Sequence, residues 1–269
     1  MHSYLKLIGH WLKLHLNLTK TLYFNFRVFN FKTAIKLPVW LYGHIQLEGL
    51  HRGCVVLQQA KTGGVKLGGG WDSEVFGRSR RHISFLRLRG KLVLGKGVVM
   101  PQGIVLSVDK NAAVRIGNNV AFNERVTIHS KTGITIKDNC RFGWNTQIFD
   151  TSFHYMVNKG KLAYRNAPVV IENNVWVGNG VSIMKGTYLP AYTIVASNSL
   201  VNKNFKEMGE HCLIGGVPAK FITNGVERLL LKDKEIDKLF ESTDNILDYE
   251  EIKEELHKEK YQIHPSKGY

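Results

Sequence analysis

The sequence predicts an all-β fold, a solenoid of six-residue repeats with three short parallel strands in each coil. Apolar residues recur at every sixth position, at Ile171, Val177, Ile183, Leu189, Val195 and Val201. The fifth position of each repeat is small, as at Val175, Val181, Thr187, Thr193 and Ser199. The 269 residues include 26 Gly and only 6 Pro, a composition that suits many tight corners.

A period of six has a direct physical meaning. A flat strand with about two inward residues, followed by a corner, uses about six residues, and three such faces complete a coil of about eighteen. Each coil then buries its apolar residues on the coil below. A helix over 171–201 is excluded, because six is not a helical period and Val, Ile and Thr favour strands.

The same ladder extends toward the N-terminus with interruptions. Its first members are Leu94, Met100 and Leu106, and after an excursion through Asp109, Lys110 and Asn111 come Ile116, Phe122, Ile128 and Ile134. A shift of two residues then gives Ile136, Phe142 and Ile148, and the frame breaks until Ile171. The fifth positions here are Val120, Val126, Cys140 and Thr146. Gly and Asn near the corners (Gly117, Asn119, Asn139, Gly143, Asn174, Gly178) are expected to permit a left-handed backbone.

Composition restricts the class of protein. Cys54, Cys140 and Cys212 lack metal-ligand spacing and are interpreted as reduced, buried thiols of a cytoplasmic protein. The formal net charge is +15, which suits a polyanionic partner such as a phosphorylated cofactor, an acidic glycan or a membrane face. No nucleic-acid motif accompanies the charge, so no nucleic-acid partner is expected.

The first 47 residues contain no acidic residue and are rich in apolar and aromatic side chains. Lys6, Lys13, Lys20 and Arg27 recur every seven residues, as on one stripe of a helix. Such a helix would either lie on an anionic membrane, with contact through residues 1–36, or cap the open core of the solenoid. Alternation of apolar residues after residue 13 leaves the helix itself open. Neither a transmembrane helix nor a signal peptide is predicted, so the expected location is the cytoplasm, or the inner face of the cytoplasmic membrane.

Three parts are therefore expected: a basic N-terminal segment at 1–47, the solenoid at 48–225, and a C-terminal extension at 226–269. Residues 226–260 hold twelve Asp and Glu against seven Lys and Arg, with apolar residues at helical spacing. One or two helices with a structural role are predicted there.

The break between Ile148 and Ile171 is the place where a loop must leave the coil. It contains Asp150 and His154. An imidazole can act as a general base near neutral pH. Asp150, four residues earlier, is expected to hold that imidazole in one tautomer.

At this point the chain resembles a known family. The repeat, the loop with one His, the segment 174–178 (Asn-Val-Trp-Val-Gly), the segment 194–201 and the closing segment 215–220 (Gly-Gly-Val-Pro-Ala-Lys) look like the hexapeptide-repeat acyltransferases. The nearer subgroup comprises the maltose and galactoside O-acetyltransferases and the polysaccharide O-acetyltransferases. The resemblance covers roughly residues 90–222.

The resemblance implies a left-handed parallel β-helix, a homotrimer with active sites between subunits, and acetyl-CoA as donor without a metal. It places the catalytic base at His154 and a positioning amide at Asn123. It also implies a cofactor cleft formed by Trp176, Gly178, Ala196, Ser197, Lys203 and Lys220, with the two lysines near the phosphates. Ala196-Ser197-Asn198 stands where relatives often have Gly-Ala-Gly.

The expected function is transfer of an acetyl group from acetyl-CoA to a sugar hydroxyl, in the biosynthesis of capsule, lipopolysaccharide or exopolysaccharide. No Ser or Cys has a paired base nearby in sequence, which favours direct transfer with His154 as general base. Open alternatives are an amine or small-molecule acceptor, and a scaffold without catalysis. A zinc enzyme like the γ-type carbonic anhydrases would need three His, with His129, His154 and His211 as candidates.

Overall fold

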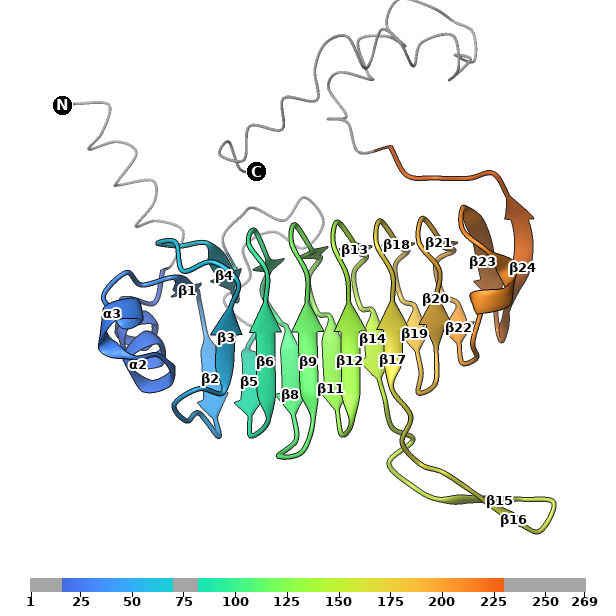
Figure 1. Cartoon of the computed structure of the whole chain (residues 1–269), viewed down its shortest axis with the longest axis horizontal. Coiled ribbons are helices and arrows are strands. Elements are labelled where there is room, and N and C mark those ends of the chain that lie inside the picture. Colours follow the sequence, from blue (N-terminus) through green and yellow to red (C-terminus); the bar gives the residue numbers. More distant parts are fainter. Residues whose placement is uncertain (1–15, 70–81, 230–269) are drawn as a thin grey trace, which may run out of the picture. The chain divides into compact units, whose positions relative to one another are not determined.

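The computed structural model describes residues 16–69 and 82–229, which form a left-handed parallel β-helix with three faces (Figure 1). The first face is β1 (Val39–Leu41), β4 (Val65–Leu67), β7 (Val99–Met100), β10 (Ala121–Phe122), β13 (Arg141–Phe142), β18 (Trp176–Val177), β21 (Ile194–Val195), β23 (Cys212–Gly216) and β24 (Ala219–Asn224). The second is β2 (Ile45–Glu48), β5 (Ser84–Leu88), β8 (Val105–Val108), β11 (Thr127–Ser130), β14 (Gln147–Phe149), β19 (Ser182–Ile183) and β22 (Leu200–Val201). The third is β3 (Val55–Leu57), β6 (Lys91–Leu94), β9 (Ala113–Ile116), β12 (Gly133–Ile136), β17 (Val169–Ile171) and β20 (Tyr188–Leu189).

The predicted ladder is the core. Its inward residues from Leu94 to Val201 are buried, and so are the fifth positions, including Cys140 and Thr146. Phe122 and Phe142 stack between neighbouring coils with ring centroids 4.7 Å apart. The three cysteines are also buried and unpaired, as expected. Burial of this continuous column is the main stabilising term of the fold, since each coil alone would expose its apolar side.

The shift of two residues in the ladder has a structural cause. Strand β12 has four residues and buries both Ile134 and Ile136, whereas β19 has two residues and buries one. Coils in the first part of the β-helix therefore use longer strands than the coils after Ile171. From β18 to β22 every strand has two residues, and there the period of six runs without a shift.

The corners use Asn and Gly for different reasons. Asn119, Asn139 and Asn174 have φ of 54°, 60° and 61°, in the left-handed region, as predicted. Gly178, by contrast, lies against the next coil, where a Cβ atom would meet the Ser197 backbone nitrogen at 2.7 Å. The prediction of a left-handed backbone was wrong at Gly178 and also at Gly117 and Gly143, because close stacking of coils requires the missing side chain at each.

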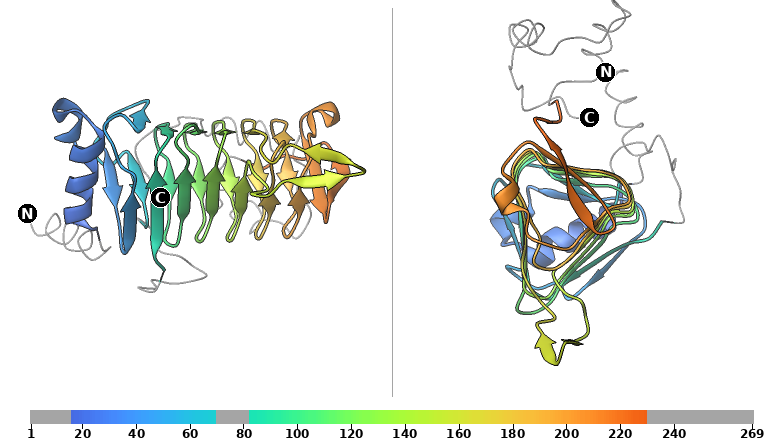
Figure 2. Two further views of the ribbon diagram at one scale, coloured as in Figure 1. Left: turned by 90° about the horizontal axis from the view of Figure 1, so that it is seen from below. Right: turned by 90° about the vertical axis from the view of Figure 1, so that its right-hand side faces the viewer.

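Two helices cover the N-terminal end of the β-helix, α2 (Leu18–Val28) and α3 (Phe31–Ala34). Figure 2 shows α2 lying across the triangular opening. Its inward side buries Phe24 and Val28, and Asn25 bonds both backbone groups of Val39. Helix α2 therefore caps the open core, one of the two roles that the sequence left open. The alternation of apolar residues after residue 13 does not mark a strand over 18–28, because these residues are helical. Lys6 and Lys13 lie outside the described residues.

The β-helix begins earlier than the predicted boundary at residue 48, because β1 begins at Val39 and β2 begins at Ile45. The antiparallel pair β23–β24 ends it at Asn224. The predicted C-terminal helices fall mostly within 230–269, outside the described residues. In the part of the chain that the structure describes, every helix is too short or too polar to cross a bilayer.

Candidate active site

The loop that interrupts the repeat runs from β14 to β17 and carries a hairpin of β15 (Met156–Asn158) and β16 (Lys161–Ala163). Figure 1 shows it projecting from one edge of the β-helix. Its two arms are joined at the neck, where the Ser152 N–H donates to the Arg165 carbonyl at 2.8 Å and the Thr151 hydroxyl donates to Asn166 Oδ1 at 2.7 Å. The loop is thus held at its base.

His154 lies just beyond this neck and is exposed. The Ser152 hydroxyl donates to its carbonyl oxygen at 3.0 Å, and its N–H donates to the Ser152 carbonyl at 2.6 Å. The backbone is therefore fixed, while the imidazole makes no hydrogen bond within the described residues. An accessible imidazole on a fixed backbone is suited to accept a proton from a bound molecule.

Asp150 does not orient His154. Its buried carboxylate accepts hydrogen bonds from the Ser130 hydroxyl, from the Thr132 hydroxyl and N–H, and from the N–H groups of Lys131 and Gly133, at 2.7–2.9 Å. These five donors come from the turn one coil earlier. The prediction of a His154 partner was wrong, because Asp150 instead ties the root of the loop to the β11–β12 turn.

Phe153 covers His129, a residue on the outer side of β11. Their ring centroids are 5.1 Å apart, and Phe153 also packs edge-on against Phe149 at 5.8 Å. Burial lowers the pKa of His129, and its buried Nε2 atom has no hydrogen-bond partner. The loop therefore packs on the His129 imidazole through Phe153, the residue before the candidate base.

The other predicted site residues lie elsewhere on the β-helix. Asn123, Gly178, Ala196 and Ser197 follow β10, β18 and β21, so they form a column on the edge between the first and second faces, the first edge. The Asn179 N–H donates to Ser197 Oγ at 3.1 Å, which joins successive turns of this column. His154 and Lys203 follow β14 and β22, on the edge between the second and third faces, the second edge.

Two further predicted residues lie on the first face. Trp176 is in β18 with 43% of its surface exposed, and Lys220 is an exposed residue of β24. The Lys203 ammonium lies 5.1 Å from the centroid of the Phe205 ring. The exposed indole and lysines remain available to a ligand on the outside of the last coils.

One chain thus divides the candidate site between two edges. The second face separates Asn123 from the root of the His154 loop. Its strands advance about 3.3 Å per residue, so with flanking residues the edges lie roughly 15–20 Å apart. The structure brings together the first-edge residues, and it does not bring them to His154.

The substitution of Gly-Ala-Gly by Ala196-Ser197-Asn198 is accommodated by the corner. Asn198 has φ of 58° and occupies the left-handed position that glycine adopts easily. Ala196 packs against Gly215, where an added Cβ would lie 2.8 Å from that of Ala196. The bulk introduced at 196 is thus matched by a glycine in β23.

A contact that the sequence reasoning missed lies beside Asn123. The Trp144 indole N–H donates to Glu124 Oε2 at 2.5 Å, and Glu124 is buried. The two residues are 20 positions apart and occupy the same corner in successive coils. A search for polar and aromatic residues one coil apart would have found the pair.

The three histidines considered for zinc do not form a cluster within one chain. No group of three potential metal ligands occurs in residues 16–69 and 82–229. His211 stacks on Tyr192 at 4.4 Å, and its Nδ1 atom lies 3.3 Å from Glu227 Oε2.

Comparison with known proteins finds no matching family model. WbbJ of Escherichia coli K12, whose name describes a lipopolysaccharide biosynthesis O-acetyl transferase, is 27% identical over 56% of this chain and 82% of its own. Galactoside O-acetyltransferase of E. coli K12 is 29% identical over 40% of this chain and 53% of its own. The mitochondrial γ carbonic anhydrase 2 of Arabidopsis thaliana is 29% identical over 61% of this chain and 52% of its own.

Among solved structures, the chain is similar to a hexapeptide-repeat acetyltransferase of Vibrio cholerae in complex with acetyl coenzyme A. The two are 30% identical over 41% of this chain and 60% of the other, with a TM-score of 0.36. The names of the curated relatives confirm the resemblance to O-acetyltransferases that the sequence motifs indicate.

Proposed function

This chain is similar to the hexapeptide-repeat O-acetyltransferases, and on that premise we propose that it moves an acetyl group from acetyl-CoA to a sugar hydroxyl. Relatives named for lipopolysaccharide biosynthesis and for galactosides favour a glycan acceptor. The proposed role is in the biosynthesis of surface polysaccharide. The observation that carries the proposal is the exposed His154 on a fixed backbone, where the repeat breaks.

The proposed reaction is a direct transfer. His154 removes the proton from the acceptor hydroxyl while the oxygen forms a bond to the thioester carbonyl carbon. The negative charge on the carbonyl oxygen is stabilised by a hydrogen-bond donor, for which the Asn123 amide is the proposed group. As the carbon–sulfur bond breaks, the imidazolium returns the proton to the leaving thiolate, so the products are an acetyl ester and free CoA.

The site is proposed to be completed between two protomers of a homotrimer. Because Asn123 and the His154 loop lie on different edges of one chain, a single chain does not place them on one substrate. The first edge of one copy, placed beside the second edge of another copy, would bring these residues to one substrate. A closed trimer supplies this contact three times by symmetry.

The CoA arm is proposed to follow the first edge. Gly178, Ala196 and Ser197 form a narrow column there, and Trp176 offers an exposed ring beside it. The phosphates would meet the exposed Lys220 on the first face and, from the second edge of the neighbouring protomer, the exposed Lys203. This places the anionic end of the donor at the C-terminal coils.

The protein is proposed to act in the cytoplasm, at the inner face of the membrane. The outward side of α2 and α3 exposes large apolar side chains, namely Leu18, Leu22, Tyr23, Phe26, Phe31 and Ile35. Lysines and arginine at 20, 27, 32 and 36 lie in the same segment. An apolar surface with cations suits the interface of an anionic bilayer, so the helices that cap the core could also bind lipid.

The test is acetyl transfer by His154→Ala, measured as release of free thiol from acetyl-CoA against a panel of glycans and nucleotide sugars. Loss of a general base should lower turnover at least about a hundredfold. His44→Ala, another exposed histidine, should keep full activity. Near-normal turnover by His154→Ala would remove the proposed base.

A mixing experiment tests the shared site. His154→Ala and Asn123→Ala should each be weakly active alone. After dissociation and joint reassembly, about one quarter of the sites would combine an intact His154 with an intact Asn123 from different protomers. Activity that does not recover on mixing would contradict a site between chains.

A further inference from the structure

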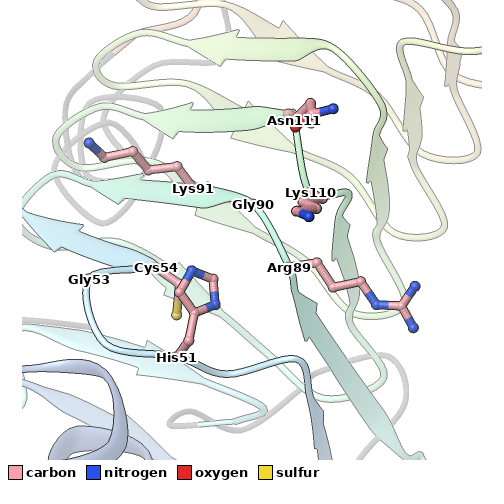
Figure 3. A pocket seen from close by; sticks show the side chains of 9 residues that line it. His51, Gly53, Cys54, Arg89, Gly90, Lys91, Lys110 and Asn111 are labelled. Carbon is pink, nitrogen blue, oxygen red and sulfur yellow. The ribbon is translucent and has the colours of Figure 1, made fainter.

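A basic pocket lies on the second edge, several coils before the His154 loop. Its volume is about 380 Å³, and it is lined by the turns that join β2 to β3, β5 to β6 and β8 to β9. Figure 3 shows Arg89 and Lys91 extending in opposite directions on either side of Gly90, with Lys110, Asn111 and His51 nearby. The excursion at 109–111, which the repeat did not explain, forms one wall of this pocket.

The charge of the pocket is positive and partly uncompensated. Arg89, Lys91 and Lys110 line it, and no acidic residue does. Glu48 bonds both Arg89 at 2.5 Å and Arg87 at 3.0 Å, and Asp109, next to Lys110, lies 4.0 Å from Lys131. Those guanidinium hydrogen bonds lower the pKa of Glu48. Lys91 and Lys110 have no ion pair among the described residues, so their charges are free to hold an anion.

The remaining lining residues add polar groups to the pocket but no reactive nucleophile. The Asn111 amide can donate, and His51 Nδ1 lies 3.1 Å from the Gly49 carbonyl oxygen. Cys54 is 1% exposed, and burial raises the pKa of its thiol, so it offers no nucleophile. The arrangement favours binding of anionic oxygens.

The pocket lies on the same edge of the β-helix as the root of the candidate catalytic loop. The turn after β8 is followed along the same edge by the turn after β11, and then by Asp150. Neighbouring strands are about 4.8 Å apart, so the step from the pocket wall at Lys110 to the loop root is roughly 10 Å. Asp150 bonds the intervening turn directly, and Lys131 of that turn lies 4.0 Å from Asp109. Figure 1 shows these turns along one edge, leading to the β15–β16 hairpin.

We infer that this pocket binds an anionic group, a phosphate or carboxylate, of the acceptor glycan, and so sets which hydroxyl reaches His154. The inference rests on the proposed acetyl transfer for the acceptor's role, while the anion site itself stands on the pocket alone. The acceptor is then an acidic or phosphorylated saccharide. A neutral sugar would lack the charge that holds it on the second edge.

Binding without acetyl-CoA tests the site. Isothermal titration of the full chain uses inorganic pyrophosphate, tetragalacturonate and neutral maltotetraose as probes. Lys91→Gln with Lys110→Gln should weaken binding of at least one acidic probe at least tenfold, which is about 1.4 kcal/mol. Lys61→Gln with Lys96→Gln removes the same charge from exposed lysines outside the pocket and should leave binding unchanged. A further variant, Lys203→Gln with Lys220→Gln, removes the lysines of the proposed CoA phosphate site. Binding of the acidic probes that this variant retains belongs to the pocket and not to the CoA phosphate site.

Binding of pyrophosphate alone would identify a phosphate site, and binding of tetragalacturonate alone a carboxylate site. Absence of binding to both acidic probes, or equal loss in the pocket and the control variants, would overturn the inference. In turnover, the pocket variant should raise KM for an acidic acceptor and leave KM for acetyl-CoA unchanged. If no acetyl transfer occurs at all, the proposed function fails while the titration still decides the anion site.

Discussion

The backbone N–H of Gly133 donates to the carboxylate of Asp150 at 2.7 Å, across one coil of the β-helix. This bond and its neighbours hold the root of the His154 loop to the turn before it. The loop is therefore positioned by a buried carboxylate that never touches the imidazole.

Asp150→Asn should destabilise the fold more than it changes the chemistry. An amide at this position keeps one acceptor oxygen and turns an NH₂ group toward buried donors, at a cost on the order of 3 kcal/mol. Urea unfolding should show that loss. Asp109→Asn, at a carboxylate with 34% of its surface exposed, should change stability by less than about 0.5 kcal/mol. Unchanged stability in Asp150→Asn would contradict the role of the carboxylate.

The covered His129 should make stability depend on pH. Burial lowers its pKa below the ordinary 6.5, so the unfolded chain takes up the proton more readily than the folded one. The free energy of unfolding should therefore fall as the pH falls through about 6.5. Phe153→Ala exposes the ring and should reduce this slope between pH 8 and 5.5. Tyr155→Ala, in the same loop but 57% exposed, should keep the wild-type slope.

Gly178→Ala should disturb both stability and donor binding. The new Cβ would lie 2.7 Å from the backbone nitrogen of Ser197, so the coils must separate, at about 1–3 kcal/mol. Thermal unfolding and titration with CoA measure the two effects. Gly133→Ala meets its nearest atom only at 3.8 Å and should be tolerated. Normal CoA binding by Gly178→Ala would argue against a donor arm on the first edge.

The exposed apolar side of α2 and α3 can be tested without removing the cap. Phe26→Ser with Phe31→Ser changes side chains that are 41% and 71% exposed and leaves buried Phe24 in place. Partition onto vesicles containing phosphatidylserine should fall at least about tenfold, because each ring contributes on the order of 1.5 kcal/mol or more when buried. Val56→Ser with Ile83→Ser is the control pair on other exposed apolar residues. A full-length protein that does not bind these vesicles would end the membrane proposal.

The coils after Ile171 could be predicted closely because their strands are short and equal, so inward residues recur every sixth position. The coils before Leu94 could not, since their strands vary in length and residues 39–94 carry no fixed period. Left-handed corners at Asn119, Asn139 and Asn174 were predictable from residue type, because Asn tolerates that backbone. The same reasoning failed at Gly117, Gly143 and Gly178, where the constraint comes from the next coil.

The candidate site was predictable in its residues but not in its geometry. His154 could be found from the break in the repeat, which marks where the chain leaves the coil. Asp150 was assigned to it because the two are close in sequence. In a β-helix the true neighbours lie one coil away, so the partners of Asp150 are at 130–133. Which edge a residue occupies depends on strand lengths that the sequence does not state.

The antiparallel strand β24 at the end of the first face has a consequence for solubility at high concentration. A column of parallel strands could in principle lengthen by accepting the end of another molecule, since open strand edges are templates for pairing. Strand β24 runs against the direction of the column and takes the hydrogen bonds of β23 on the first face. At the other end α2 blocks the opening with a helix. A chain shortened before Ala219 would leave β23 uncovered and prone to fibre growth.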